Sequence, residues 1–211
     1  MFIKTDGINT KQIYHLLVQT VLPRPIAWVL TDNGTGEGKG RYNLAPFSFF
    51  NAISASPPLL MFSLTRKSGS DVKKDTWLNI EQRKKCTVHL ALEDDMDAVI
   101  STSAELSHGQ SEVDLAKLDM ADGPNGHLPR LKNSRIAFHC HLHEIYQPTD
   151  ASAVIFCHVD EVYVDDSIIQ VDGDRFTIDP KLIKPLSRLG GNAYGLLGEI
   201  VEKSRPDPER K

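Results

Sequence analysis

The sequence has few cysteines and no excess of basic residues. Cys86, Cys140 and Cys157 are the only cysteines among 211 residues, and no two of them form a CxxC pair. An odd, widely spaced set argues against a disulfide framework and against the common cysteine zinc motifs. The formal net charge is −4, whereas a general nucleic-acid-binding protein needs a basic face. We therefore expect three buried free cysteines and no nucleic-acid partner.

Long apolar runs are absent as well. No segment approaches the roughly 18 consecutive apolar residues that a membrane-spanning helix requires. The first 14 residues lack the apolar core of a signal peptide. Hydrophobic residues nevertheless make up 40% of the chain, which is enough for a real core. These features predict a cytoplasmic protein with no membrane partner.

Short β-type segments recur along the chain, separated by turn signals such as Asn33-Gly34 and Asp172-Gly173. These segments are residues 25–31, 59–65, 85–92, 134–147, 151–166, 167–171 and 175–178. Their spacing predicts a mainly β fold with short helices, closed as a barrel or packed as a sandwich. We expect one domain over residues 1–200, followed by a charged and frayed tail at 201–211.

Helical segments are few and short. We expect helices at residues 10–19, 75–84, 95–104 and 112–119, and a helical turn at 193–200. The helix at 75–84 should begin with Asp75 as its N-cap and turn Leu78 and Ile80 toward the core.

Glycines alternate in residues 33–40, which invites comparison with nucleotide-binding loops. The spacing matches neither GxGxxG nor GxxxxGK[ST], and Asn43 and Pro46 follow in place of a helix. We interpret this segment as the flexible tip of a hairpin.

Three histidines alternate along one expected strand, at His139, His141 and His143. Side chains two residues apart lie on the same face of a strand, but the three attachment points spread over about 13 Å. One ion cannot reach all three without a bulge. We therefore predict a polar strand face and no metal site, with a two-histidine site that includes His158 as the alternative.

Residues 43–62 combine aromatic and small polar residues with Pro46, Pro57 and Pro58, which exclude a continuous helix. Residues 63–80 should form, in order, the end of a buried strand, a basic loop and the start of a helix. That loop holds Arg66, Lys67, Ser68, Lys73 and Lys74. Cations beside the free N–H groups of a helix start form an anion site. A planar aromatic cofactor with a phosphate would need both segments.

Five motifs occur in a fixed order along the chain. They are RPIAWV (24–29), NLAPFSFFN (43–51), PPLLMFS (57–63), KDTWLNI (74–80) and PLSRLGGNAY (185–194). With them the chain resembles the flavin reductase-like family, FMN-binding proteins of split β-barrel fold, over about residues 15–200. The resemblance implies a homodimer that binds FMN at the barrel edge.

The resemblance also implies which residues bind the cofactor. The backbone at Pro46, Phe47, Ser48 and Phe49 would lie along the isoalloxazine edge. Asn43 and Asn51 would flank that segment. The residues expected at the ribityl chain and the phosphate are Ser63, Arg66, Lys74 and Thr76. Arg188 would be a C-terminal arginine near the flavin. We expect the Asp75 side chain to turn back and cap the N–H of Trp77 or Leu78, because a carboxylate repels phosphate.

The activity that the resemblance implies is NAD(P)H-dependent reduction of FMN by hydride transfer to flavin N5, with NADH or NADPH as the donor. The flavin supplies the chemistry, so no residue is assigned as catalytic. The alternative is a non-catalytic FMN-binding electron-transfer or flavin-carrier protein that takes electrons from a redox partner protein.

Overall fold

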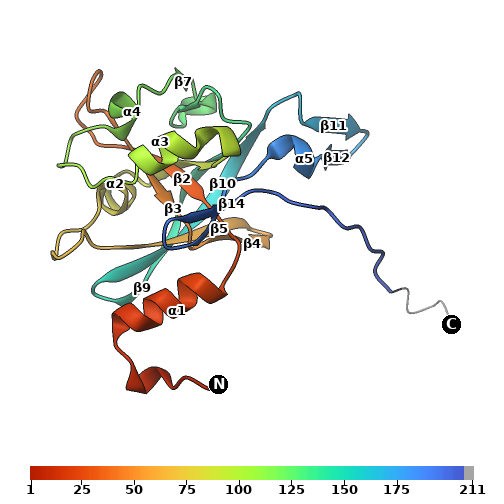
Figure 1. Ribbon diagram of the computed structural model, residues 1–211. Helices are drawn as coiled ribbons and strands as arrows, with labels where there is room; N and C mark the ends of the chain where they lie inside the picture. The colour runs from red at the N-terminus through yellow and green to blue at the C-terminus, as the bar shows by residue number, and fades with distance from the viewer. Residues whose placement is uncertain (207–211) are drawn as a thin grey trace.

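The computed structural model describes residues 1–206, and its elements are mainly β-strands (Figure 1). The strands are β1 (Arg24–Pro25), β2 (Ala27–Asp32), β3 (Tyr42–Phe47), β4 (Phe50–Ala55), β5 (Pro58–Thr65), β6 (Lys85–Leu90), β7 (Met120–Ala121), β8 (Arg130–Leu131), β9 (Ile136–Thr149), β10 (Ser152–Val164), β11 (Ile169–Asp172), β12 (Arg175–Ile178), β13 (Ser187–Gly190) and β14 (Ala193–Gly195). The α-helices are α1 (Thr10–Thr20), α2 (Asp75–Arg83), α3 (Met96–Ser101), α4 (Glu112–Leu115) and α5 (Pro180–Ile183). Short 3-10 turns lie at Thr5–Gly7, Glu93–Asp95 and Pro124–Gly126. The expectation of a mainly β chain with short helices is confirmed.

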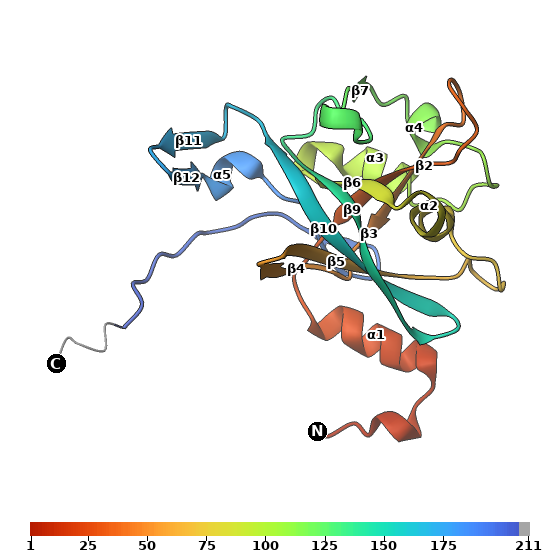
Figure 2. The same ribbon diagram turned by 180° about the vertical axis from the view of Figure 1, so that it is seen from behind.

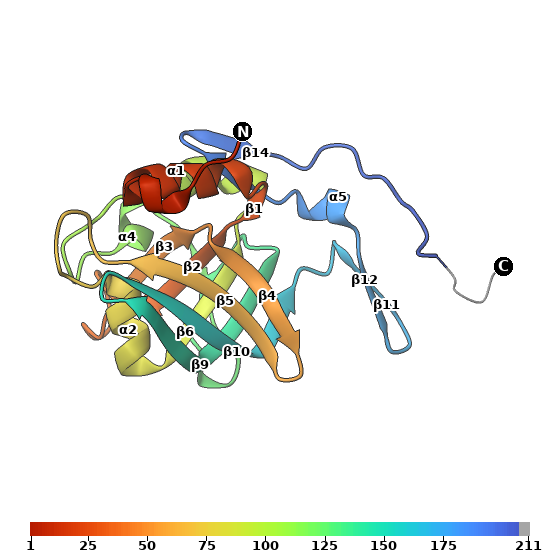
Figure 3. The ribbon, with the colours of Figure 1, turned by 90° about the horizontal axis from the view of Figure 1, so that it is seen from below.

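Seven antiparallel strands form the main sheet, in the order β3-β2-β6-β9-β10-β5-β4. The two edge strands, β3 and β4, are consecutive in the chain and are joined by the turn at residues 48–49. The long pair β9 and β10 crosses the molecule (Figure 2). In Figure 3 the strands curve around a common interior, with α1 at one end and α2 at one side.

Both faces of β2 are buried, which explains its nearly continuous apolar sequence. Ala27 and Val29 point into one core with Trp77 of α2, while Trp28 and Leu30 point into a second core. Side chains alternate along a strand, so successive residues of β2 serve the two cores in turn. Replacing a fully buried tryptophan such as Trp77 with alanine costs about 3–5 kcal/mol.

The expected helices at 10–19 and 75–84 are confirmed as α1 and α2, with differences in detail. The N-cap of α2 is Lys74, so Asp75 is already the first helical residue. Ile80 is fully buried, whereas Leu78 is half-buried. The helices expected at 95–104 and 112–119 shorten to α3 and α4.

The helical turn expected at 193–200 is wrong. Residues 193–195 form β14, which pairs with β13 so that Tyr194 lies opposite Arg188. The sheet partner decides the conformation here, because local propensity is weak in a segment with Gly195 and Gly198.

The three cysteines are buried and free, as expected. The Sγ atoms of Cys86 and Cys157 lie 3.6 Å apart. The hydrogen bond that Cys86 shares with Cys140 and the burial of the thiol raise the pKa of Cys86 well above its ordinary value. These thiols therefore act as small apolar side chains.

Residues 33–40 join β2 to β3, which agrees with a hairpin connection. Asn33 fastens this connection, because its side chain donates to the Gly40 carbonyl at 2.9 Å.

Residues 201–206 of the expected tail are exposed and form no regular element, and residues 207–211 lie outside the described part of the chain. Figure 1 shows residues 201–206 extending away from the strands. Within residues 1–206, no helix is long and apolar enough to cross a membrane.

Candidate functional site

Three cavities meet at the turn between the two edge strands. They have volumes of about 400, 370 and 70 Å³. Pro46 borders all three, while Phe47, Ser48 and Lys74 each border two of them. We call them cavity A (about 400 Å³), cavity B (about 370 Å³) and cavity C (about 70 Å³). The turn that carries the NLAPFSFFN motif is therefore the centre of the candidate site.

Cavity A lies between α1 and the β13–β14 hairpin, with two arginines in its wall. Arg188 lies over the ring of Tyr194, 4.4 Å from its centroid, and donates to the Gly191 carbonyl at 2.7 Å. Gly190 has φ +109°, and a Cβ there would lie 2.8 Å from the Val18 carbonyl oxygen of α1. Glycine at this position therefore lets the hairpin approach the helix.

Arg24 is a buried cation at the edge of cavity A, with only 5% of its surface exposed. One of its Nη atoms donates to the carbonyl oxygens of Val18 and Val21, at 2.6 and 2.7 Å. Burial lowers the pKa of Arg24 from its ordinary value, yet an arginine stays protonated in proteins. Its Nε has no hydrogen-bond partner within residues 1–206. Cavity A thus has a fixed positive charge at its edge, and that charge belongs to a side chain with one buried, unpaired donor.

A carboxylate already occupies donor groups of the basic loop. Glu105 accepts from the backbone N–H of Ser68 at 3.1 and 3.2 Å, and pairs with Lys74 Nζ at 3.2 Å. Burial raises the pKa of Glu105, but the hydrogen bonds from Lys74 and Ser68 outweigh it, so the pKa lies below its ordinary value. These donors are therefore arranged to hold an anion.

A buried polar network supports the turn from inside. Asn43 donates to the hydroxyl oxygens of Thr31 and Thr76, at 3.2 and 2.9 Å. Asn79 donates to the same Thr31 hydroxyl at 3.0 Å. Asn43 and Thr76 both border cavity C, and their hydrogen bonds tie β3 to the start of α2.

Most of the residues expected to bind FMN gather around the three cavities. Those that border at least one of them are Asn43, Pro46, Phe47, Ser48, Phe49, Ser63, Lys74, Thr76 and Arg188. Phe47 also stacks on Phe62 in the core, with ring centroids 5.3 Å apart. Phe49 is 36% exposed and lies near Tyr14 of α1.

Two of the expected residues border none of these cavities. Asn51 is exposed on β4, and its side chain accepts from the Ala52 N–H at 2.9 Å. Arg66 donates to the Asp150 carbonyl at 2.6 Å and also to the Asp71 carbonyl. Arg66 thus fastens the basic loop to the β9–β10 turn.

The expected cap by Asp75 is wrong. Its carboxylate lies 2.7 Å from His108 Nδ1 and 3.2 Å from Lys67 Nζ. As the first helical residue, Asp75 lies past the N-cap position, and two nearby donors hold its side chain away from the helix backbone.

Several residues of the site were missed by sequence reasoning. They are Tyr14 and His15 of α1, Arg24, Tyr194 and Glu105. Arg24 opens the RPIAWV motif, and its charge among apolar neighbours was a usable signal. Tyr194 closes the PLSRLGGNAY motif, so it carried a signal too. Tyr14, His15 and Glu105 carry no local signal, because the fold alone brings them to the turn.

Comparison with known proteins identifies the family. A family model described as a flavin reductase like domain matches residues 19–174. The chain belongs to this flavin reductase-like family. The matched segment contains the turn at residues 46–49 and the whole basic loop, so four of the five motifs noted in the sequence lie inside it, while PLSRLGGNAY (185–194) lies beyond its end.

Three solved structures are similar to this chain. Component B of nitrilotriacetate monooxygenase from Bacillus cereus is 31% identical, with a TM-score of 0.85, over 96% of this chain and 98% of that one. The 2-nitrobenzoate 2-nitroreductase NbaA of Pseudomonas fluorescens is 26% identical, with a TM-score of 0.85, over 98% and 96%. A protein named as a putative flavin reductase with a split barrel domain, from Shewanella frigidimarina, is 20% identical, with a TM-score of 0.79, over 98% of this chain and 100% of that one, and shows the fold alone.

The fold is therefore a mainly β split barrel, as expected. The family and its neighbours support flavin-related oxidoreduction as the general activity of this chain.

Proposed function

We propose that this chain is an FMN-binding oxidoreductase that uses NADH or NADPH to reduce its flavin. The observation that carries the proposal is the meeting of three cavities at residues 46–48, beside a loop whose donors hold a carboxylate. The ring and the phosphate of FMN need these two features together.

The residues present fit a flavin mononucleotide. Cavities A and B, at about 400 and 370 Å³, lie in the range of ligand pockets and share the turn as a common wall. The Glu105 carboxylate binds the Ser68 N–H and Lys74, the donors to which a phosphate would bind. We therefore assign Lys74, which borders both cavity B and cavity C, to the phosphate.

The charge of cavity A supports a negatively charged or electron-rich ligand. Arg24 and Arg188 border it, and none of its lining residues within 1–206 is Asp or Glu. When bound, FMN would supply the redox chemistry by accepting a hydride at N5 from the nicotinamide. The two arginines would stabilise negative charge on the ligand, and the protein would otherwise position the two rings.

We further propose that residues 1–200 act as one flavin-binding domain. Cavity A is built from α1, the β3–β4 turn, α3 with Ser103, and the β13–β14 hairpin. Its lining residues run from Tyr14 to Tyr194, so a segment that lacked α1 or the β13–β14 hairpin would not complete its walls.

A homodimer is part of the proposal. Large apolar side chains are exposed on α1 and just after it, on the β11–β12 hairpin and on the C-terminal segment. They are Tyr14, Leu17, Val21, Leu22, Val171, Phe176, Leu196, Leu197 and Val201. Exposed apolar surface of this kind marks an interaction site, and a second copy of the chain would cover it.

The visible spectrum of the purified, untagged chain, followed by anaerobic addition of NADH or NADPH, tests the activity. We expect bound FMN and rapid bleaching by at least one nucleotide. Bound flavin that stays oxidised with both nucleotides, but is reduced by dithionite, would instead support the electron-transfer or carrier alternative. A chain that binds no FMN would refute the proposal altogether.

A further inference from the structure

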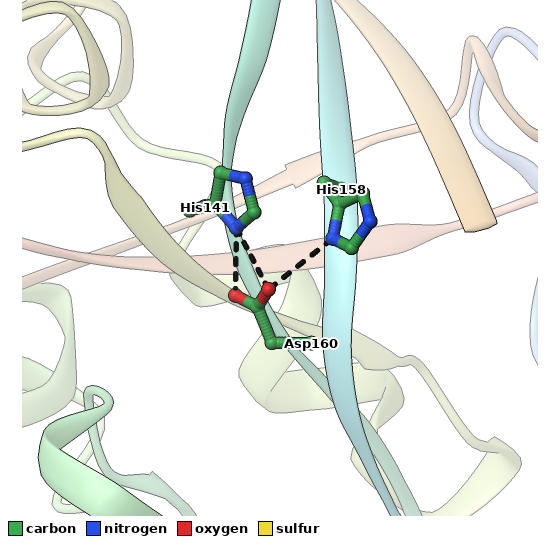
Figure 4. A group of neighbouring side chains, drawn as sticks. All are labelled: His141, His158 and Asp160. Atoms are coloured by element: carbon green, nitrogen blue, oxygen red, sulfur yellow. Dashed lines mark hydrogen bonds and ion pairs between the residues drawn. The ribbon is translucent and has the colours of Figure 1, made fainter. Parts of the chain in front are cut away.

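Two imidazoles and one carboxylate converge on the β9–β10 ribbon (Figure 4). His141 Nδ1 lies 2.7 and 2.9 Å from the two oxygens of Asp160, and His158 Nδ1 lies 3.2 Å from Oδ1. The two imidazole rings stack with their centroids 4.7 Å apart. None of these three residues borders cavities A, B or C, so the cluster is separate from the flavin site.

A β-bulge brings the carboxylate to the histidines. The register pairs His158 directly with His141. On β10, Val159 lies opposite Cys140 and Glu161 lies opposite His139, which leaves Asp160 as the extra, unpaired residue. A bulge re-aims the side chain of its extra residue. Here the Asp160 carboxylate reaches the side on which both imidazoles lie, as Figure 4 shows.

The donor atoms have the spacing of a metal site. One donor atom from each of the three residues lies within 4.8 Å of the others. A tetrahedral zinc ion with bonds of about 2.0–2.1 Å holds neighbouring donors about 3.3 Å apart. Asp160 Oδ1 lies 2.7 and 3.2 Å from the two imidazole nitrogens, and these nitrogens lie within 4.8 Å of each other. Side-chain rotations that widen the first two separations would bring the donors to the spacing of a zinc site. His141 is 47% exposed, which leaves a path for an ion to enter.

A fourth donor lies close to the cluster. His127 Nε2, on the segment that follows the 3-10 turn Pro124–Gly126, lies 3.9 Å from Asp160 Oδ2. Its Nδ1 is buried without a hydrogen-bond partner within residues 1–206. His127 lies outside the group of donors within 4.8 Å of one another, so its ring would have to move toward the cluster. It would then complete a tetrahedral set of three imidazole nitrogens and one carboxylate oxygen, of the type that zinc prefers.

We propose that His141, His158 and Asp160 bind a divalent first-row transition metal, with zinc as the best match, and that His127 supplies the fourth position. This inference departs from the expectation of no metal. That expectation considered His139, His141 and His143 together, but the fold separates them: His139 is buried beside Thr87, and His143 is exposed elsewhere on β9. The bulge at Asp160 supplies the ligand that strand spacing alone does not.

Titration of the full chain, without a histidine tag, against Zn²⁺ in competition with a chromophoric chelator tests this site. We expect one ion per chain with a Kd in the micromolar range or below. His141→Gln, His158→Gln and Asp160→Asn should each weaken binding by at least about tenfold, because each removes a direct ligand and even the loss of an outer-shell partner typically costs about 10- to 100-fold. Co²⁺ should give the strong visible absorption of a tetrahedral site.

His143→Gln is the matched control, because His143 lies on the same strand outside the cluster, and this variant should bind Zn²⁺ like the parent chain. His127→Gln should weaken binding if His127 is the fourth ligand. Thermal melts of each variant separate lost ligation from lost folding. Substoichiometric zinc, or an affinity that the three cluster substitutions leave unchanged, would overturn the proposal and leave a hydrogen-bonded histidine–aspartate cluster.

Discussion

Lys74 offers a sharp test of the phosphate assignment, because a second lysine next to it provides a matched control. Lys74 borders cavities B and C and pairs with Glu105. Lys73 pairs instead with Glu81 at 2.8 Å, lies over the Trp77 ring and borders none of these cavities. Lys74→Met and Lys73→Met therefore remove the same charge from adjacent positions, and only the first removes a charge from the site.

The expected magnitude follows from the exposure of the pair. A hydrogen bond to a charged group contributes about 1.5–3 kcal/mol, which corresponds to about 10- to 150-fold in affinity. The side chains of Lys74 and Glu105 are 31% and 37% exposed, so solvent screening favours the lower end. We expect Lys74→Met to weaken FMN binding by about tenfold, and to leave riboflavin binding nearly unchanged, because riboflavin has no phosphate.

Glu105→Gln should act in the opposite direction. The carboxylate occupies the Ser68 N–H and Lys74, so a bound phosphate would compete with it for these donors. Removing its charge should strengthen FMN binding several-fold and leave riboflavin binding unchanged. Arg66→Ala should have a smaller and less selective effect, because Arg66 fastens the loop and borders none of the three cavities.

Flavin fluorescence quenching measures both ligands with every variant. If Lys74→Met weakens FMN and riboflavin equally, Lys74 shapes the ring pocket and the phosphate binds elsewhere. If Lys73→Met weakens FMN binding as much as Lys74→Met does, the effect comes from the total positive charge of the loop, and the assignment to Lys74 is wrong.

Three further predictions concern a crowded glycine, a buried histidine and the oligomeric state. Gly190→Ala should lower the melting temperature and weaken flavin binding, since its Cβ would meet the Val18 carbonyl, whereas Gly191→Ala, in open space, should cost less. Burial lowers the pKa of His89 from 6.5 to about 4, and its Nε2 accepts from the Leu131 N–H. The unfolding free energy should therefore fall by up to about 3 kcal/mol as the pH drops from 6.5 toward 4. Urea titrations at several pH values measure this decrease, and His89→Gln should lack it. Sedimentation should find a dimer whose interface buries about 2,000 Å² or more, and a flavin-loaded monomer at micromolar concentration would contradict this.

Much of the strand content was predictable, because burial on one or two faces leaves a direct trace in the sequence. The β2 run is apolar from Ala27 to Leu30 because its two faces enter two cores. The β5 strand alternates instead, with one fully buried face that enters a single core. The strand β14 was not predictable in this way. Its three residues become a strand only through pairing with β13, a contact that residues 193–200 do not encode locally.

The site was predictable to the extent that its residues share a motif. Pro46, Ser48 and Lys74 lie in ordered motifs and do border the cavities. Arg66 has the right charge in the right loop, but it binds the carbonyl of Asp150, 84 positions away, which composition cannot indicate. The histidine–aspartate cluster was missed for a similar reason, since a bulge changes which side chains share a face.

The proline in the NLAPFSFFN motif has a physical explanation in the sheet order. The strand β3 is an edge of the seven-stranded sheet, so alternate N–H groups along it point away from β2. One of these outward groups, the N–H of Leu44, donates to the buried carboxylate of Glu112 at 3.0 Å. The next outward position is Pro46, which has no N–H to satisfy and loses no ladder bond. The edge of the barrel can therefore face three cavities at Pro46 without a buried, unpaired donor.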